Sequence, residues 1–163
     1  MSKIKEITCH KALDSRGQWT LATTVTLENG ITATQHIPKG ASTGENESYY
    51  LPVDKAVHIV STVLNHALQG KSVYDQKEID NLMIQMDGTY NKKHLGGNSV
   101  ISVSLAIAQC AALNKNIELY EYISSLYGSP LNSKIKFPTP VFNILNGGKH
   151  AQNNLSFQEF MVI

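Results

Sequence analysis

A histidine and a glutamate near the end of the sequence have side chains suited to moving protons. His150 follows an apolar run at 142–145, Asn146 and a pair of glycines, and Glu159 begins a second apolar run. Each run predicts a buried strand, and the glycines predict a sharp turn that something can approach closely. A His and a Glu at the C-terminal edges of buried strands are candidate site residues in a parallel α/β protein. Taken alone, His150 favours a structural role.

A second stretch with chemical potential is the loop at 38–44. It contains the hydroxyls of Ser42 and Thr43 among small residues, with glycines at both ends. Such a composition permits close approach to a ligand, although by itself it is more typical of an ordinary surface loop.

Composition and charge exclude several classes of function. The chain has 163 residues, 42% of them hydrophobic and 17% charged, and a formal net charge of +1, which gives no electrostatic footprint for nucleic acid or a membrane. Cys9 and Cys110 are far apart and form no metal-binding pattern, as expected for inert thiols in a reducing compartment. The polar start of the chain predicts no secretory signal, so we expect a cytoplasmic protein.

The elements that must position these residues begin with strands. Alternating patterns predict strands at 4–9, 20–27 and 31–37, with a polar turn at 12–17 between the first two. Asn29-Gly30 predicts a hairpin turn, because this pair readily supplies positive φ. The three segments therefore predict an antiparallel meander with one face to be covered.

Helices follow the strands. Helical spacing predicts helices at 54–68, 75–86, 98–113 and 119–126, with Val63 and Met86 on core faces. Asp75 and Glu78 predict a capping box for the second helix. The third is apolar nearly all round, so it should be the central, buried helix.

Strands followed by helices predict an α+β domain, here a three-stranded antiparallel meander packed on a helical bundle. We expect this domain to span residues 1–133. Residues 132–136 form a polar linker, and 134–163 begin a second domain.

Six short motifs in one order closely resemble the N-terminal part of the enolase family. They are Asp-Ser-Arg-Gly at 14–17, Gly-Ala-Ser-Thr-Gly at 40–44, Asp-Gly-Thr at 87–89, Leu-Gly-Gly-Asn at 95–98, Asn-Gly-Gly-Lys-His-Ala at 146–151, and Phe-Gln-Glu-Phe-Met at 157–161. The resemblance covers essentially the whole chain. It implies that 134–163 are the first strands of a truncated TIM-type barrel, whose remainder is absent.

The resemblance implies a lyase of glycolysis that interconverts 2-phosphoglycerate and phosphoenolpyruvate, with two Mg²⁺ ions stabilising the enolate-like intermediate. By position, Glu159 matches the residue that assists the general acid. Ser42 matches the loop ligand of the second Mg²⁺, and Thr43 accompanies it. The resemblance also implies substrate-binding residues, a supporting turn and a homodimer. The substrate-binding residues are His150, Gln158 and Ala41, and the turn that supports the site and the subunit contact contains Arg16 and Gly17.

The sequence also departs from the family. The family's lysine base, its main general-acid glutamate and the carboxylates of the first Mg²⁺ have no counterpart in these 163 residues. Ala22 replaces an acidic residue that pairs across the family's dimer, Lys39 replaces a serine, and several residues are missing between Glu47 and Ala56. We therefore expect a chain that is inactive alone. The alternatives are a non-catalytic capping or binding module that acts with a partner chain, and a functionless remnant.

Overall fold

The computed structural model describes residues 2–40, 44–128 and 137–163. It divides into two units. The main unit comprises Met1–Lys39 and Asn46–Leu131, and the C-terminal unit comprises Gly40–Glu45 and Asn132–Ile163. Each is described separately. The linker predicted at 132–136 lies outside the described residues.

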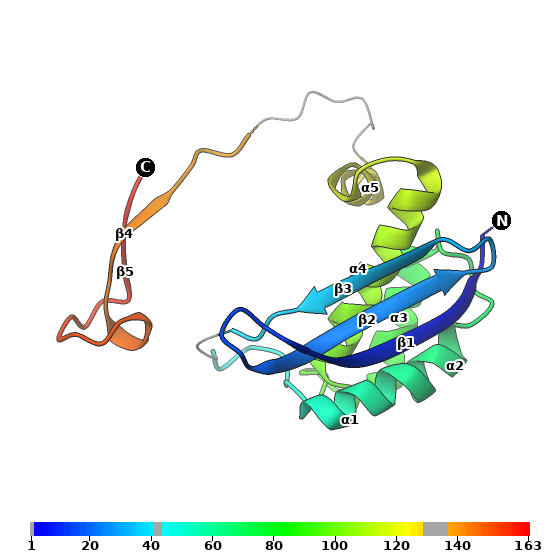
Figure 1. Ribbon diagram of the computed structural model, residues 1–163, viewed down its shortest axis with the longest axis horizontal. Coiled ribbons are helices and arrows are strands. Elements are labelled where there is room, and N and C mark those ends of the chain that lie inside the picture. The colour runs from blue at the N-terminus through cyan, green and yellow to red at the C-terminus, as the bar shows by residue number, and fades with distance from the viewer. Residues whose placement is uncertain (1, 41–43, 129–136) are drawn as a thin grey trace. The chain divides into compact units, whose positions relative to one another are not determined.

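The main unit contains a three-stranded antiparallel sheet in the order β1-β2-β3, built from β1 (Ile4–Leu13), β2 (Trp19–Leu27) and β3 (Thr32–Ile37) (Figure 1). The predicted meander is confirmed, and so is its Asn-Gly turn, where Gly30 has φ +88°. The first strand is longer than predicted because it pairs with β2 as far as Leu13 opposite Trp19. The polar turn between them is correspondingly shorter.

The helical run begins with α1 (Val53–His58), a π-helical segment (Ile59–Leu64) and α2 (Asn65–Leu68). The buried line Ala56, Val60, Leu64 and Leu68 repeats every four residues, which suits a helix widened by i→i+5 bonds. Val63 falls off this line and is 40% exposed, so its predicted core position is wrong.

Three further helices complete the main unit: α3 (Gln76–Asp87), α4 (Gly97–Lys115) and α5 (Leu119–Leu126). Asp75 does precede α3, but its side chain makes no capping hydrogen bond, so the predicted box is wrong there. A capping box forms instead at α5, where the Glu118 amide donates to the Glu121 carboxylate at 2.9 Å. Met86, predicted to be buried, is 37% exposed.

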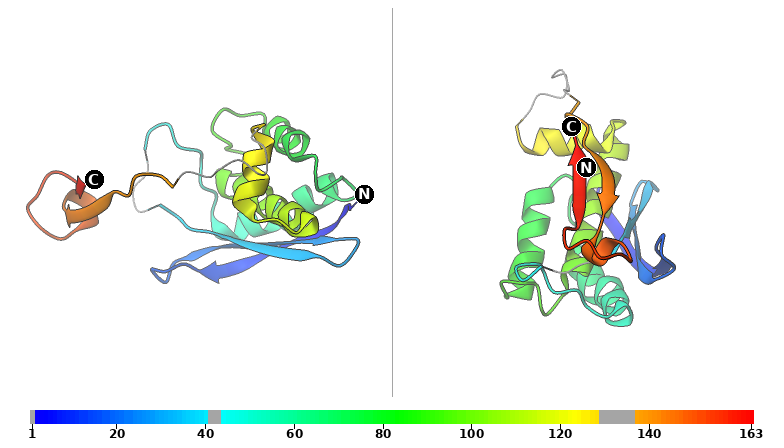
Figure 2. Two further views of the ribbon diagram at one scale, coloured as in Figure 1. Left: turned by 90° about the horizontal axis from the view of Figure 1, so that it is seen from above. Right: turned by 90° about the vertical axis from the view of Figure 1, so that its left-hand side faces the viewer.

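The core lies between the sheet and α4, and the helices lie on one side of the sheet (Figure 2). As predicted, α4 is central: it packs against β2, β3, α3 and α5. Val25 and Leu27 of β2 and Val103 and Ile107 of α4 are fully buried in this core. The α+β class is therefore confirmed.

The C-terminal unit contains β4 (Phe142–Asn146), a 3-10 turn (Gly148–His150) and β5 (Glu159–Val162). The two strands pair with each other in antiparallel orientation, with Asn146 opposite Glu159. The predicted parallel arrangement is thus wrong for this pair. The prediction of burial is wrong as well, because every residue of both strands is exposed.

Among the helices in the described part of the chain, no single one is long and apolar enough to cross a membrane. The pair α4 and α5, bent by 105°, passes that test together, by length and composition alone.

Candidate functional site

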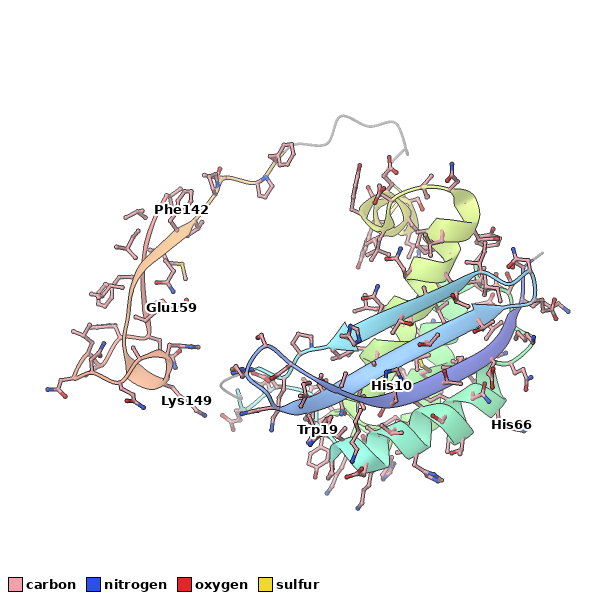
Figure 3. All side chains as sticks on the ribbon, in the orientation of Figure 1. His10, Trp19, His66, Phe142, Lys149 and Glu159 are labelled. Carbon is pink, nitrogen blue, oxygen red and sulfur yellow. The ribbon has the colours of Figure 1, made fainter. Side chains whose placement is uncertain are left out.

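Antiparallel pairing places His150 and Glu159 at the same end of the β4-β5 hairpin. His150 ends the 3-10 turn that follows β4, and Glu159 is the first residue of β5. Figure 3 shows Glu159 near the turn that carries Lys149. In a parallel pair, the C-terminal ends of the two strands would lie side by side. Here the C-terminal end of β4 lies beside the N-terminal end of β5.

Two glycines allow the turn after β4 to form. A Cβ on Gly147 would lie 2.5 Å from both the Leu155 Cβ and the Phe157 carbonyl oxygen, closer than real contacts. Gly148 has φ +55°, in the left-handed region that favours glycine. The predicted sharp turn with close approach is confirmed, although the group that approaches is the chain itself.

Backbone hydrogen bonds then close the loop onto the strand. The Gly147 amide donates to the Gln158 carbonyl at 3.0 Å, and the Gly148 amide donates to the Leu155 carbonyl at 2.8 Å. The Asn153 side chain adds a bond to the Asn146 carbonyl at 2.9 Å. The side chains of His150, Gln158 and Glu159 are exposed at this closed end, where a small molecule can reach them.

The other predicted site residues lie elsewhere in the chain. Ala41, Ser42 and Thr43 fall outside the described residues, so their predicted roles stay predictions. Arg16 and Gly17 lie in the turn between β1 and β2. Gly17 has φ +68°, which accounts for the glycine at this position.

The Arg16 turn is held by a carboxylate. Asp14 Oδ1 accepts hydrogen bonds from the amides of Arg16 at 2.8 Å and Gln18 at 2.9 Å. The bond from Gln18 is the main reason why the pKa of Asp14 lies below its usual value. The Arg16 guanidinium in turn donates to the carbonyl of Lys39, the last residue of the main unit before the 40–45 segment.

Sequence reasoning missed the role of Asp87, because the sequence marks it only as a helix end. The residue is 1% exposed, and its carboxylate accepts hydrogen bonds from the amides of Thr89 at 3.0 Å, His94 at 3.0 Å and Leu95 at 2.7 Å. Burial alone would raise the pKa of Asp87, but these bonds outweigh it and hold the pKa below its usual value. The motif at 87–89 therefore shapes the loop that leads into α4.

Asn98 is a second residue that sequence reasoning missed. It is 3% exposed, and its side chain holds the backbone of Leu51. The paired glycines before it were the available signal, since such a pair often marks a close approach between two backbones.

The described residues contain no group of three or more His, Cys, Asp or Glu side chains that could hold a metal ion. Cys9 and Cys110 are free thiols. Burial raises the pKa of both, that of Cys110 to about 11, which leaves little reactive thiolate at neutral pH.

The described residues define a class: an α+β unit with a three-stranded antiparallel sheet and helices, together with a second unit that contains a two-stranded antiparallel hairpin. Comparison with protein families gives two matches in this order. Residues 4–123 match the enolase N-terminal domain, and residues 134–163 match the enolase C-terminal TIM barrel domain. The chain belongs to the enolase family.

Proposed function

We propose that this chain supplies the N-terminal part of a lyase that interconverts 2-phosphoglycerate and phosphoenolpyruvate with loss of water. The observation that carries the proposal is the pair of consecutive family matches, N-terminal domain and then barrel domain. The exposed His150 and Glu159 at one end of the hairpin support it, because they leave two proton-carrying side chains open to a substrate.

In this proposal each residue of the hairpin end has its own task. The substrate hydroxyl leaves as water once it has accepted a proton. Glu159 assists this step by stabilising that proton close to the hydroxyl. His150 lies beside the substrate, and Gln158 lines the pocket with an amide that can donate to or accept from an oxygen-rich ligand. The bonded Gly147-Gly148 turn fixes the backbone that carries all three.

Magnesium is part of the proposed reaction, since it would stabilise the negative charge that develops on the intermediate. The described residues by themselves do not fit a Mg²⁺ site, because no cluster of carboxylates is present among them and Mg²⁺ requires near-octahedral oxygen ligands. Ser42 is the proposed metal ligand from this chain, with Ala41 beside it on the substrate and Thr43 following. The remaining ligands must come from residues outside this sequence.

Three further proposals concern organisation. We place the boundary between the two domains at 133/134. We place the protein in the cytoplasm, in keeping with its free thiols. We expect a weaker homodimer than in the family, because Ala22 on β2 has no charge to pair with a second subunit and is fully buried.

A non-catalytic capping or binding module is the second candidate function. The observation that favours it is the self-contained core of the main unit, which is built from residues of that unit alone. Such a module would be a folded, monodisperse chain that binds neither Mg²⁺ nor 2-phosphoglycerate.

The two functions separate when the chain is co-expressed with a polypeptide carrying the remaining strands of an enolase barrel. We expect phosphoenolpyruvate to form, and the Glu159→Gln variant to lower kcat by about 10²-fold or more with a smaller change in KM. Gln152→Ala, an exposed change in the same loop, is the matched control and should leave kcat unchanged. No product from a folded complex would contradict the lyase and favour the capping module.

A further inference from the structure

Two exposed histidines lie on either side of the middle strand of the sheet. In the register of the sheet, Ala22 of β2 is opposite His10 of β1 on one side and opposite His36 of β3 on the other. Side chains that are directly opposite on neighbouring strands point to the same face of a sheet. The three residues therefore form one row, with the small side chain of alanine between the two imidazoles.

This row lies on the face of the sheet that points away from the helices. Thr23, the next residue of β2, points towards them, because its hydroxyl donates to Ser102 of α4 at 2.9 Å. Since side chains alternate along a strand, Ala22 points to the opposite, open face. His10 and His36 share that face and are exposed, and Figure 3 shows His10 on the sheet.

Ala22 is fully buried although it is on the open face. It belongs to neither of the two apolar core clusters of the described residues, so its burial must come from groups on its own face. The side chains placed directly beside its methyl group are the imidazoles of His10 and His36. Burial of the methyl group indicates that these rings lean over it and therefore towards each other.

The spacing of the two histidines suits one metal ion. Neighbouring strands are about 4.8 Å apart, so the Cβ atoms of His10 and His36 are about 10 Å apart. Two imidazoles that lean inwards, each with a bond of about 2.0–2.1 Å to the ion, bridge such a gap. Neutral imidazole is the commonest metal ligand in proteins and suits zinc and copper, whereas Mg²⁺ and Ca²⁺ prefer oxygen ligands.

The open face also carries no positive charge that would repel a cation. Within β1, β2 and β3, all of whose residues the structure describes, the side chains on this face are threonines, alanines, the two histidines and one glutamate, Glu6. Lys11 follows His10 but points to the helical side, where its ammonium group pairs with Asp54 of α1 at 2.8 Å. A bound cation would therefore meet imidazole nitrogens, hydroxyls and water.

We propose that His10 and His36 form a binding site for a divalent transition-metal ion of the zinc and copper class on the open face of the sheet. Water fills the remaining coordination positions, because the row supplies two protein ligands. The site is separate from the Mg²⁺ chemistry of the proposed lyase and does not depend on it. An ion held there joins β1 to β3 across β2, so its binding also stabilises the folded main unit.

Titration of Zn²⁺ alone into the full chain tests this site, with nuclear magnetic resonance of the imidazole groups as the readout. We expect the signals of His10 and His36 to shift together with one dissociation constant, and Mg²⁺ at the same concentrations to shift neither. His10→Gln and His36→Gln should each weaken zinc binding by the remaining histidine at least about tenfold, because the second ligand is present at a high effective concentration. Both residues are exposed, so these variants should keep the fold.

Two further variants distinguish one shared ion from two independent histidines. His66→Gln removes an exposed histidine of α2 and is the matched control, which should leave the zinc affinity of the pair unchanged (Figure 3). Ala22→Leu keeps both histidines but places a larger side chain between them, so zinc binding should weaken at least about tenfold. If Ala22→Leu does not fold, the two glutamine variants decide the question.

The same titrations can overturn the proposal. Two imidazoles that shift with separate dissociation constants would show independent histidines rather than one site. Unchanged zinc affinity of the remaining histidine in both glutamine variants, or an equal response to Mg²⁺, would contradict the shared transition-metal site as well.

Discussion

Ile107 in α4 and Ile144 in β4 are the same residue type in opposite settings. Ile107 is fully buried between the helices and the sheet, whereas Ile144 is 67% exposed. The same contrast holds for the two units as a whole: the main unit has a closed apolar core, and the C-terminal hairpin has apolar strands held by glycines, backbone hydrogen bonds and asparagines. The difference shows that the buried apolar core lies in the main unit, whereas the hairpin to which we assign the proposed chemistry is exposed.

The largest change in the free energy of unfolding is expected when the two isoleucines are replaced in turn. Ile107→Ala removes fully buried apolar atoms and leaves a cavity, so the free energy of unfolding of the main unit should fall by about 2–5 kcal/mol. Ile144→Ala, the matched control, should change it by less than about 0.5 kcal/mol. Urea denaturation followed by far-ultraviolet circular dichroism measures both. Equal losses would mean that the hairpin belongs to the same cooperative core.

A smaller loss is expected for Asp87→Asn, which removes the charge from three amide hydrogen bonds. We expect about 2 kcal/mol of destabilisation near pH 7. Because the folded pKa of Asp87 lies below the unfolded value, its contribution is present above that unfolded value and is lost as the pH falls through the folded pKa.

The gap in stability between wild type and Asp87→Asn should therefore narrow as the pH is lowered from about 7 to about 3. Urea titrations at a series of pH values would show this. A stability difference between wild type and Asp87→Asn that stays constant from about pH 7 to about pH 3 would contradict this expectation. It would indicate that the charge of the Asp87 carboxylate does not contribute to stability.

The sheet is the most predictable part of the fold. Alternation in β2 and the Asn29-Gly30 turn indicate both the strands and their order. An ideal helical period misplaces Val63, because the chain forms a π-helical turn there. Asp75 and Glu78 have the residue types and spacing of a capping box. These features do not ensure that the Asp75 side chain reaches a backbone amide of the first helical turn, and here it does not.

The candidate site is only partly predictable. Residue type and the family resemblance select His150 and Glu159 as candidates. The two residues lie at the same end of the hairpin because β4 and β5 pair in antiparallel orientation, and the two apolar runs do not reveal that orientation. Asp87 accepts hydrogen bonds from backbone amides across the loop that follows it, and Asn98 is hydrogen-bonded to the backbone of Leu51, which is far away in the sequence. Such contacts depend on the tertiary fold and leave no periodic pattern.

A local effect is expected for Gly147→Ala. The added Cβ would collide with Leu155 and the Phe157 carbonyl, so the turn that carries His150 must open while the main unit stays intact. Amide chemical shifts from Gly148 to Gln158 should change, and the urea midpoint of the main unit should not. Asn154→Ala, in the same loop, should leave both unchanged. A lowered midpoint would show that the two units are energetically coupled.

The last prediction concerns the reactivity of thiols in the two units. It compares a buried thiol of the main unit with an exposed thiol in the hairpin, and we expect no change in stability at neutral pH. Cys110 is fully buried and has its pKa raised to about 11, so a thiol reagent should modify it at least about 100-fold more slowly in the native chain than in urea. A cysteine introduced by Met161→Cys, at a position that is 50% exposed, should react almost as fast in both states. Equal protection of the two thiols would contradict the contrast between the units.

The raised pKa of Cys110 also sets a pH dependence of stability. Because the folded pKa lies above the ordinary thiol value of 9.0, the stabilisation linked to the neutral thiol is fully present below 9.0 and is lost as the pH rises towards 11. Cys110→Ala should therefore lose less stability than wild type between these two pH values, as measured by urea denaturation. Parallel losses in the two proteins would show that Cys110 does not titrate with unfolding.

Amide hydrogen exchange of the chain with and without the barrel polypeptide tests the central claim most directly: that the main unit is complete and the hairpin belongs to an active barrel. Alone, we expect strong protection in β2 and α4 and weak protection in β4 and β5. With the barrel polypeptide, protection of the β4 and β5 amides should rise by about 100-fold or more as phosphoenolpyruvate formation appears. Unchanged exchange in β4 and β5 when the polypeptides form a complex would contradict this claim.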